Sequence, residues 1–473
     1  MRRRAFARSL IVVVLSIQAT AALGQPQEAG IDAFLDAAAA SRRRAAEAQK
    51  EIAAGWRDGD AAMLVDLLDI VQRTRDLNPR TFMPPDRFAR FLEEQTGQTF
   101  GEDLARWQQW VWNLPYSPHP DYGTFKGRLY AMLDPRFVVF FRSPAEPRIR
   151  LDEIEWGGVS INAIPPLDHP KHVPAAEATY LDDDNVVFGF FLDGEARAYP
   201  KRILAWHELA LDHVGNRDLA IVYCPLCGTV IPFDARVGGK VLTFGTSGLL
   251  YQSNKLLFDH ETASLWSSIT GEPVVGPLVQ LDLRLSALPV VTTTWGEWRA
   301  RHPDTLVLSV DTGYHRDYSE GAAYRAYFET DDLMFGVAHR DGRLPNKAEV
   351  FVVRSTTSPF DSTAAPPAPT PPFAISTKVL REQPVFHTAV DGTNIVVITS
   401  AAGASRAYAS ASYRFADADG SARVHDTDGR EWRVDEEFLQ ATFDPSLRLP
   451  RVAGHRAFWF GWYAQHPDTV LID

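Results

Sequence analysis

Cysteine is almost absent from this chain, because its 473 residues include only two. Cys224 and Cys227 lie three positions apart, so within the chain they can join each other or share one metal ion. The signatures of several enzyme classes are missing as well: there is no P-loop, no His-Glu-x-x-His zinc-protease motif and no dinucleotide-binding glycine pattern. Ser247 is not in a nucleophile elbow, because Leu249 stands where that motif requires glycine. The sequence therefore leaves open whether the protein is an enzyme.

Basic clusters and long apolar runs are scarce too. The net charge is −12, and beyond the N-terminal leader Lys and Arg form no run longer than the three arginines at 42–44. This balance argues against nucleic acid or an anionic membrane surface as a partner. No second long apolar stretch follows the leader, so we expect no transmembrane segment in the mature chain. A hydrophobic content of 45% with 12 Trp and 27 Phe is typical of a globular protein, and the length allows two or three domains.

Residues 1–24 have the layout of an export signal. Arginines at positions 2–4 precede an apolar run over 10–17 that is too short to span a bilayer, and small residues continue to Gly24. We expect cleavage near Gly24-Gln25 and a periplasmic or secreted mature protein in an oxidising compartment. Arg3 and Arg4 also approach the twin-arginine pattern, which marks the export of folded proteins.

A helical region is predicted over residues 25–149. The spacing of apolar residues indicates helices over 31–56, 61–75, 85–95 and 101–112. Three tryptophans in the last of these have helical spacing, which favours packing in a core or interface over a ligand platform. The β-branched and aromatic run over 137–141 predicts a strand.

Short strands and turns dominate the rest of the chain, so the predicted fold class is α+β, mainly β. A cysteine-bearing β-rich unit is expected over residues 150–345, with a hairpin turn at Asp193-Gly194. A second β-rich unit is expected over 346–473. Its Pro-rich insertion at 355–373 is expected to be a flexible loop or linker.

The second unit repeats the first in a degenerate form. In the first copy Trp295-Gly296-Glu297-Trp298 is followed by His302-Pro303-Asp304-Thr305. In the second copy Trp459-Phe460-Gly461-Trp462 is followed at identical spacing by His466-Pro467-Asp468-Thr469, and Trp432 matches Trp266 of the first copy. Apolar pairs upstream match at a constant offset. We therefore predict two copies of one β-rich unit that share a topology and superpose.

The cysteine pair follows a predicted buried strand at the point where the chain turns, and three interpretations compete. With His207 upstream, Cys224 and Cys227 would form a soft ligand set suited to copper first and zinc second. The thiols could instead cycle between dithiol and disulfide, although the residues after the pair predict strand and turn rather than the helix of thioredoxin-like proteins. The third possibility is a structural disulfide between Cys224 and Cys227.

The second copy lacks the candidate ligands. In an alignment without gaps, His207 falls on Gln383, Cys224 on Ser400 and Cys227 on Gly403. A small gap would instead place His387 opposite His207. Because the framework is retained where the cysteines are not, the comparison favours a special task for the first copy.

A series of motifs runs through the first unit: GEARAYP at 194–200, WHE at 206–208, YCPLCG at 223–228, LTFGTSGLL at 242–250, SLW at 264–266, and TGY at 312–314 before Asp317-Tyr318. Together they resemble the bacterial family catalogued as domain of unknown function 3179, closely over about 150–350 and more loosely beyond. The resemblance implies membership and no particular reaction. His260 stands where arginine is more familiar in the family, either as an extra ligand or as a tolerated change.

The leading hypothesis from the sequence is an exported protein that binds copper or zinc through Cys224, Cys227 and His207, for metal handling or redox chemistry. The alternatives are a thiol–disulfide redox protein and a non-catalytic binding or scaffold protein with a structural disulfide. The sequence names no partner or substrate.

Overall fold

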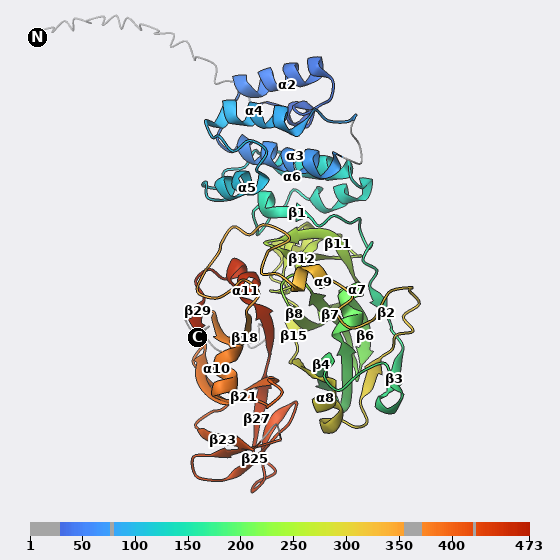
Figure 1. The fold of residues 1–473 in the computed structure, drawn as a ribbon, viewed down its shortest axis with the longest axis vertical. Helices are drawn as coiled ribbons and strands as arrows, with labels where there is room; N and C mark the ends of the chain where they lie inside the picture. The colour runs from blue at the N-terminus through green and yellow to red at the C-terminus, as the bar shows by residue number, and fades with distance from the viewer. Residues whose placement is uncertain (1–28, 76–79, 354–370, 420–421) are drawn as a thin grey trace, which may run out of the picture.

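The computed structural model describes residues 29–75, 80–353, 371–419 and 422–473. The predicted export signal and residues 355–370 of the predicted insertion lie outside these ranges. Figure 1 shows a layer of helices at the top, the first β-rich unit in green and yellow below it, and the second unit in orange and red beside the first. The predicted fold class, α+β and mainly β, is confirmed. Within the described ranges no helix combines the length and the hydropathy that a membrane crossing requires.

Six α-helices form the described part of the N-terminal layer. They are α1 (Ile31–Asp36), α2 (Arg42–Ala54), α3 (Asp60–Thr74), α4 (Pro85–Thr96), α5 (Leu104–Trp112) and α6 (Tyr122–Ala131). α3 lies at the centre, because it is buried on nearly all sides and contacts α1, α4, α5 and α6. Trp107 and Trp112 of α5 are buried, and the indole N–H of Trp112 donates to the carbonyl of Asp152 at 3.1 Å. The packing role predicted for these tryptophans is confirmed.

The single helix predicted over 31–56 is in fact two helices. Ser41 begins α2 as its N-cap, and its hydroxyl accepts the backbone N–H of Arg44. A serine that can bond to the backbone in this way favours a helix start over a helix interior. A bridge between Ala39 and Phe82 pairs the intervening segment with another part of the layer. Apolar spacing alone does not reveal such a break.

The strand predicted over 137–141 is wrong, because Pro135–Phe141 forms a 3-10 helix, η1. Asp134 begins it by accepting the backbone N–H of Arg136 at 3.0 Å. Phe137, Phe140 and Phe141 are buried at a helical spacing, in the same core as α6. A short apolar run fits a strand and a buried helical turn equally well, so its periodicity could not decide between them.

The first unit contains three five-stranded sheets, with the orders β1-β11-β12-β13-β14, β15-β8-β7-β6-β2 and β16-β4-β5-β17-β3. The strands are β1 (Ile154–Trp156), β2 (Leu167–Asp168), β3 (His172–Pro174), β4 (Val186–Leu192), β5 (Glu195–Pro200), β6 (Leu209–Val214), β7 (Arg217–Cys224), β8 (Thr229–Asp234), β11 (Phe244–Tyr251), β12 (Asn254–Asp259), β13 (Leu265–Ser267), β14 (Pro273–Val275), β15 (Ser286–Ala287), β16 (Val291–Thr294) and β17 (Leu306–Leu308); β9 (Arg236–Val237) and β10 (Lys240–Val241) form a separate pair. The helices are α7 (Lys201–His207), α8 (Trp295–Arg301) and α9 (Arg325–Phe328). The predicted turn at Asp193-Gly194 joins β4 to β5, with a positive φ at both residues.

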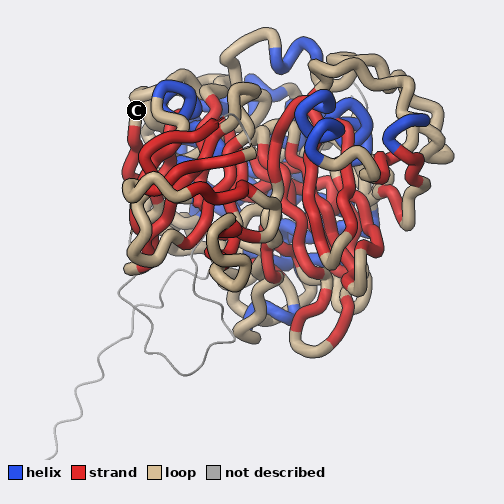
Figure 2. Tube along the Cα trace, turned by 90° about the horizontal axis from the view of Figure 1, so that it is seen from below, coloured by secondary structure: helices blue, strands red, loops and turns tan. Residues whose placement is uncertain are grey.

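The second unit contains a four-stranded sheet, β28-β18-β19-β29, and an eight-stranded sheet, β20-β21-β22-β27-β26-β25-β24-β23. The strands are β18 (Glu349–Val353), β19 (Phe373–Ser376), β20 (Val385–Val390), β21 (Thr393–Thr399), β22 (Ser405–Ala409), β23 (Phe415–Asp419), β24 (Arg423–Asp426), β25 (Glu431–Val434), β26 (Phe438–Ala441), β27 (Arg448–Val452), β28 (Gly454–Phe458) and β29 (Val470–Ile472), and the helices are α10 (Thr377–Glu382) and α11 (Trp459–Gln465). Figure 2 shows the strands of the two units side by side.

One sheet of the first unit and the four-stranded sheet of the second share a topology. The order β16-β4-β5-β17 in the first corresponds to β28-β18-β19-β29 in the second, and in both the first two pairs are antiparallel and the third is parallel. The indole N–H of Trp266 donates to Asp259 at 2.8 Å, and that of Trp432 donates to Asp426 at 3.1 Å. Equivalent side chains therefore make equivalent bonds, as the repeat predicts.

The hairpin turn of each unit packs on a helix of the other. The backbone N–H of Phe458, at the start of α11, donates to the carbonyl of Cys227 at 2.7 Å. In the reciprocal contact the hydroxyl of Ser400 donates to the carboxylate of Glu297 on α8 at 2.7 Å. The cysteine-bearing turn of the first unit is thus held between two sheets of its own unit and a helix of the second.

Candidate dithiol site

The two cysteines occupy the turn between β7 and β8. Cys224 is the last residue of β7 and pairs across the hairpin with Thr229, the first residue of β8. Gly228 ends the turn with a φ of +62°, which strains other residues, and a Cβ there would lie 3.0 Å from the ring of Phe458, so the position favours glycine. A tight turn brings residues three positions apart close together. The fold of the hairpin therefore places the two thiols next to each other.

Both thiols are free and buried, and the disulfide considered from the sequence is not formed in this structure. Cys224 is 2% exposed and Cys227 is fully buried. The S–H of Cys227 can donate to the carbonyl of Ser253, 3.3 Å away, or to the sulfur of Cys224. When it points to the sulfur of Cys224, Cys227 is a hydrogen-bond donor to Cys224.

The surroundings divide the two thiols into different roles. Burial opposes the ionisation of Cys224, but hydrogen bonds from Cys227 and from the backbone N–H of Lys255, together with the Lys255 ammonium, outweigh it and lower the pKa of Cys224. Burial and the neighbouring Cys224 thiolate raise the pKa of Cys227. Cys224 is therefore the thiol that ionises first, and the thiolate is the reactive form.

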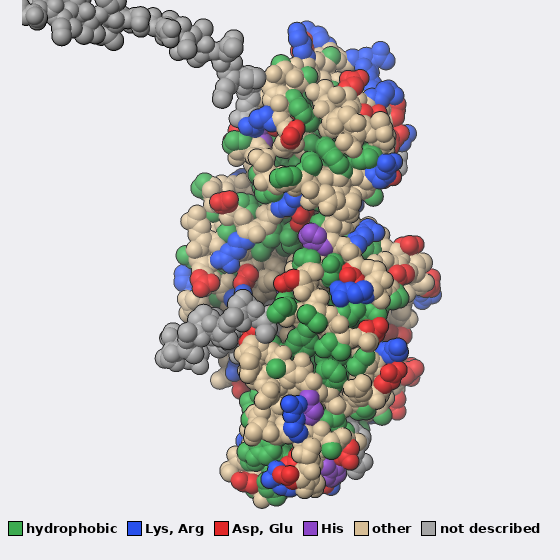
Figure 3. All heavy atoms as spheres, turned by 90° about the vertical axis from the view of Figure 1, so that its left-hand side faces the viewer, with side chains coloured by type: hydrophobic (Ala, Val, Ile, Leu, Met, Phe, Trp, Pro, Cys, Tyr) green, Lys and Arg blue, Asp and Glu red, His purple; other side chains and the backbone are tan. Residues whose placement is uncertain are grey.

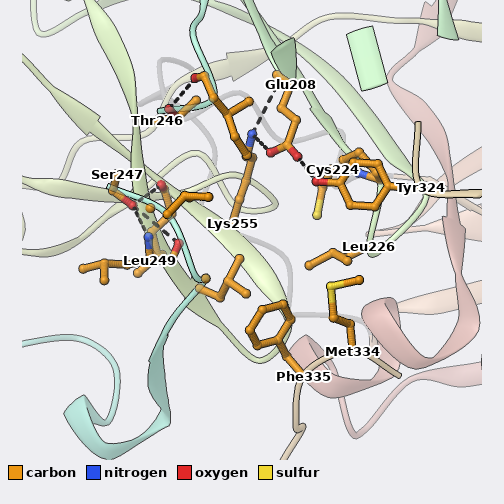
Figure 4. Close-up of a pocket in the computed structure, with 17 residues that line it drawn as sticks. Glu208, Cys224, Leu226, Thr246, Ser247, Leu249, Lys255, Tyr324, Met334 and Phe335 are labelled. Carbon is orange, nitrogen blue, oxygen red and sulfur yellow. Dashed lines mark hydrogen bonds and ion pairs between the residues drawn. The ribbon is translucent and has the colours of Figure 1, made fainter. Parts of the chain in front are cut away.

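A cavity lies directly beside Cys224, with an empty volume of about 550 Å³ that includes open solvent at its mouth. It is bounded by the cysteine turn, by β11 and β12, and by the segment after α9. Figure 4 shows Cys224, Leu226, Phe335 and Met334 along one side of it. Most of the lining is apolar: Leu226, Leu249, Leu250, Leu256, Met334 and Phe335. Cys224 thus faces a chamber that a small molecule can enter.

A buried ion pair forms the polar part of the cavity wall. The Lys255 ammonium binds the carboxylate of Glu208, and both side chains are more than nine-tenths buried. Tyr324 donates its phenolic O–H to the same carboxylate (Figure 4). Burial and the Glu208 carboxylate raise the pKa of Tyr324, so it stays a proton donor. Glu208 reaches this position as the C-cap of α7, with a left-handed φ of +59° that a non-glycine residue adopts only under structural constraint.

His207 is next to Glu208 in sequence but has other partners. Its Nδ1 lies 2.9 Å from the carbonyl oxygen of Pro165 and its Nε2 lies 2.6 Å from the hydroxyl of Tyr318. Since a carbonyl can only accept, Nδ1 carries the proton and Nε2 accepts from Tyr318. Burial lowers the pKa of His207 and keeps the ring neutral. His207 is not among the residues that line the cavity beside Cys224.

The predicted three-ligand metal site is therefore only partly brought together. The two sulfurs are adjacent, whereas both nitrogens of His207 are used elsewhere. Across the ranges that the structure describes, no group of three or more His, Cys, Asp and Glu side chains is placed to hold a metal ion. Metal binding by Cys224 and Cys227 stays a prediction.

Three residues of the site were missed by the sequence analysis: Glu208, Lys255 and Tyr324. Glu208 was part of a motif whose histidine drew attention as the softer ligand. Lys255 and Tyr324 lie far from the cysteines along the chain, and only the pairing of β11 with β12 and the path of the segment around α9 bring them to the turn.

The second unit retains the framework of this site without its chemistry. The backbone N–H of Tyr223 donates to the carbonyl of Glu208, and the matched bond joins Thr399 to Pro384. This match supports the alignment without gaps, so proline replaces Glu208 and Ser400 replaces Cys224. Trp266 pairs with Leu257 and Trp432 pairs with Val424, so these two partners correspond. Counting two residues back from each places Ala422 at the position of Lys255.

The second turn also corrects one predicted correspondence. The backbone N–H of Ser400 donates to the carbonyl of Ala404 at 2.9 Å and closes the turn. The loop between Ser400 and Ala404 is therefore one residue shorter than the loop between Cys224 and Thr229. Gly403 has a φ of +84° and directly precedes the closing residue, as Gly228 does. Gly403 therefore corresponds to Gly228, and not to Cys227 as the alignment predicted.

Comparison with known proteins identifies a family but no activity. No curated protein and no solved structure matches the chain. A family model described as a protein of unknown function, DUF3179, matches residues 161–469, which cover most of both β-rich units and include Glu208, Cys224, Cys227, Lys255 and Tyr324. The chain belongs to the DUF3179 family.

Proposed function

We propose that this protein is an exported thiol–disulfide redox protein in which Cys224 and Cys227 cycle between a dithiol and a disulfide. The observation that carries the proposal is the placement of two adjacent free thiols, of which Cys224 lines a cavity and Cys227 is fully buried behind it. A solely structural pair needs neither the cavity nor the asymmetry. Export would place the pair in a compartment where disulfides form and persist.

The exchange proceeds in two steps that balance. The Cys224 thiolate attacks one sulfur of a substrate disulfide, the substrate S–S bond breaks, and the leaving thiolate takes up a proton. Cys227 then loses its proton and attacks the sulfur of Cys224, which releases the second substrate thiol and leaves a Cys224–Cys227 disulfide. One substrate disulfide and two protein thiols thus become two substrate thiols and one protein disulfide. The reverse sequence oxidises two thiols.

The buried ion pair supports this chemistry from the cavity wall. The Lys255 ammonium favours the thiolate of Cys224, while Glu208 neutralises the lysine and opposes a negative charge on either sulfur. The phenol of Tyr324 is a proton donor beside the same carboxylate. Lys255 and Glu208 are therefore positioning residues, and Cys224 and Cys227 are the reacting ones.

The first test is the product of oxidation. We expect the reduced protein, treated with 2-hydroxyethyl disulfide, to lose two thiols and to gain one internal disulfide that peptide mapping assigns to Cys224 and Cys227. The physical reason is that the turn between β7 and β8 holds the two sulfurs within hydrogen-bonding reach of each other. Thiols that stay inert, or that link separate chains, would show that the pair does not cycle.

We propose soft-metal binding by the two sulfurs as a second candidate. Two adjacent thiolates are a soft donor set that suits copper(I), whereas zinc needs four ligands, and the described residues supply no third His, Cys, Asp or Glu at this point. Bound copper would either transfer electrons or be handed on to another protein. His207 does not fit as a ligand, because its ring nitrogens are engaged with Pro165 and Tyr318.

A titration with copper(I) against a coloured chelator separates the ligands. We expect the wild-type protein and His207→Ala to compete equally for the metal, and Cys224→Ser to lose the competition, because only the sulfurs are adjacent. The matched control is His213→Ala, an exposed histidine paired with Asp218. A loss in His207→Ala as large as that in Cys224→Ser would restore the three-ligand site, and a wild-type protein that does not compete would remove this candidate.

A further inference from the structure

The charges in the wall of the cavity beside Cys224 cancel. Apart from Cys224, the lining residues that carry a formal charge are Glu208 and Lys255, and they bind each other. The outer face in Figure 3 is different, because acidic and basic side chains are interspersed over it. A charged ligand therefore meets partners on the outside of the molecule, whereas the fixed charges of the cavity wall pair with each other and leave only the Cys224 thiolate, when it forms, as a charge facing the ligand.

The hydroxyl groups of the cavity wall are also occupied. Ser247 donates to the carbonyl of Leu256 at 2.5 Å and accepts the backbone N–H of Leu249 at 3.0 Å. Thr246 donates to the carbonyl of Ile164 at 2.8 Å. The remaining surface is aliphatic, aromatic or thioether, and burying an unpaired charge against such a surface costs several kcal/mol in general. The wall selects for apolar and uncharged ligands.

The depth of Cys224 limits the size of the ligand. Cys224 is 2% exposed and can be reached from the cavity, whose mouth is bordered by Met334, a flexible side chain that is 54% exposed. A disulfide on the surface of a folded protein cannot descend to a sulfur this deep. A small molecule can reach Cys224 through the cavity without unfolding the turn.

We propose that the substrate of this site is a small, uncharged disulfide with apolar substituents. The inference rests on the proposed thiol–disulfide function and adds to it the class of substrate. Charged disulfides and disulfides of folded proteins are excluded, the first by the walls and the second by the depth of Cys224.

The test compares disulfides of similar size and different charge on the reduced, full-length mature protein. The probes are diethyl disulfide, 2-hydroxyethyl disulfide, dithiodiglycolate and cystamine. Each rate is divided by the rate of the same probe with free 2-mercaptoethanol at the same pH, which removes the intrinsic reactivity of the disulfide. We expect diethyl disulfide to be favoured over both charged probes by on the order of tenfold or more, with 2-hydroxyethyl disulfide between them.

Two variants locate the selection in the cavity. Met334→Glu places a carboxylate at the mouth and is expected to slow diethyl disulfide and to shift the preference toward the cationic cystamine. Met132→Glu is the matched control, because Met132 is 45% exposed and lies in the helical layer, and it is expected to keep the wild-type preference.

The outcomes separate this inference from the function on which it rests. Internal disulfide formation with equal corrected rates for all four probes, or with a preference for a charged one, overturns the substrate class and leaves the thiol–disulfide function standing. Failure of every probe to oxidise the pair overturns the function itself. An unchanged preference in Met334→Glu would show that the cavity is not the route to Cys224.

Discussion

Serine in place of Cys227 is expected to stop the exchange halfway and to leave half of the substrate bound to Cys224. Cys224 faces the cavity and has the lowered pKa, so its attack does not require the second cysteine as a nucleophile. Release of the bound half does require it, because the chain has no third cysteine. With excess 2-hydroxyethyl disulfide we expect two thiols released per wild-type chain and one per variant chain, with the adduct visible in the intact mass.

The reciprocal variant, Cys224→Ser, is expected to react with the disulfide more slowly than the wild type, by on the order of a hundredfold or by a larger factor, because Cys227 is fully buried and its pKa is raised. Ser400→Ala is the matched control, since Ser400 occupies the position of Cys224 in the copy without thiols. It is expected to react as the wild type does. Two thiols released from Cys227→Ser, or a wild-type rate in Cys224→Ser, would contradict the roles assigned to the two sulfurs.

The second large effect concerns stability, at the junction of the helical layer and the first unit. Glu155 of β1 is buried, accepts a hydrogen bond from Gln108 of α5 at 3.0 Å and lies 3.7 Å from Arg73 of α3. Burial and the nearby Asp69 raise the pKa of Glu155 to about 7. The folded protein therefore holds a proton on this residue over a pH range in which the unfolded chain has already released it.

The sign follows from proton linkage. Between about pH 4.5 and pH 7 the folded state binds the extra proton, so raising the pH weakens folding by about 1.4 kcal/mol per pH unit, or about 3 kcal/mol in all. Glu155→Gln removes this contribution. We expect urea unfolding to show the variant gaining about 3 kcal/mol relative to the wild type from pH 4 to pH 8.

Glu94→Gln is the control for this measurement, because Glu94 is an exposed glutamate of the same helical layer. Its difference from the wild type is expected to stay constant with pH. Parallel stability curves for Glu155→Gln and the wild type would show that Glu155 ionises in the folded protein as it does in the unfolded chain.

The sequence predicted best what depends on repeated or regular patterns. The matched Trp-x-x-Trp and His-Pro-Asp-Thr segments led to the two units, because identical packing around α8 and α11 retains identical residues at identical spacing. The strand before Cys224 was predictable because six of its eight residues are buried and the run is apolar. Patterns failed where a local bond decides the outcome, as with the cap at Ser41 and the 3-10 helix after Asp134.

The site was predictable only in part, because sequence distance conceals spatial neighbours. The cysteine pair was evident from the sequence, and the structure places both thiols in one turn beside a cavity. His207 was chosen because it lies close to the pair along the chain, but the direction of its side chain at the end of α7 leads to Pro165 and Tyr318. Lys255 and Tyr324 have no motif of their own, and their role arises from sheet pairing and chain path.

The reciprocal packing of the two turns has a consequence for the history of the chain. A turn and a helix of one unit meet the helix and turn of the other, which is the self-complementary contact that two identical subunits form about a two-fold axis. The single chain thus contains the counterpart of a homodimer interface. In such a pair, one turn can carry two cysteines while the other turn, without them, makes the equivalent contact through the bond of Ser400 to Glu297. The second turn, which is shorter and free of cysteine, still makes this contact.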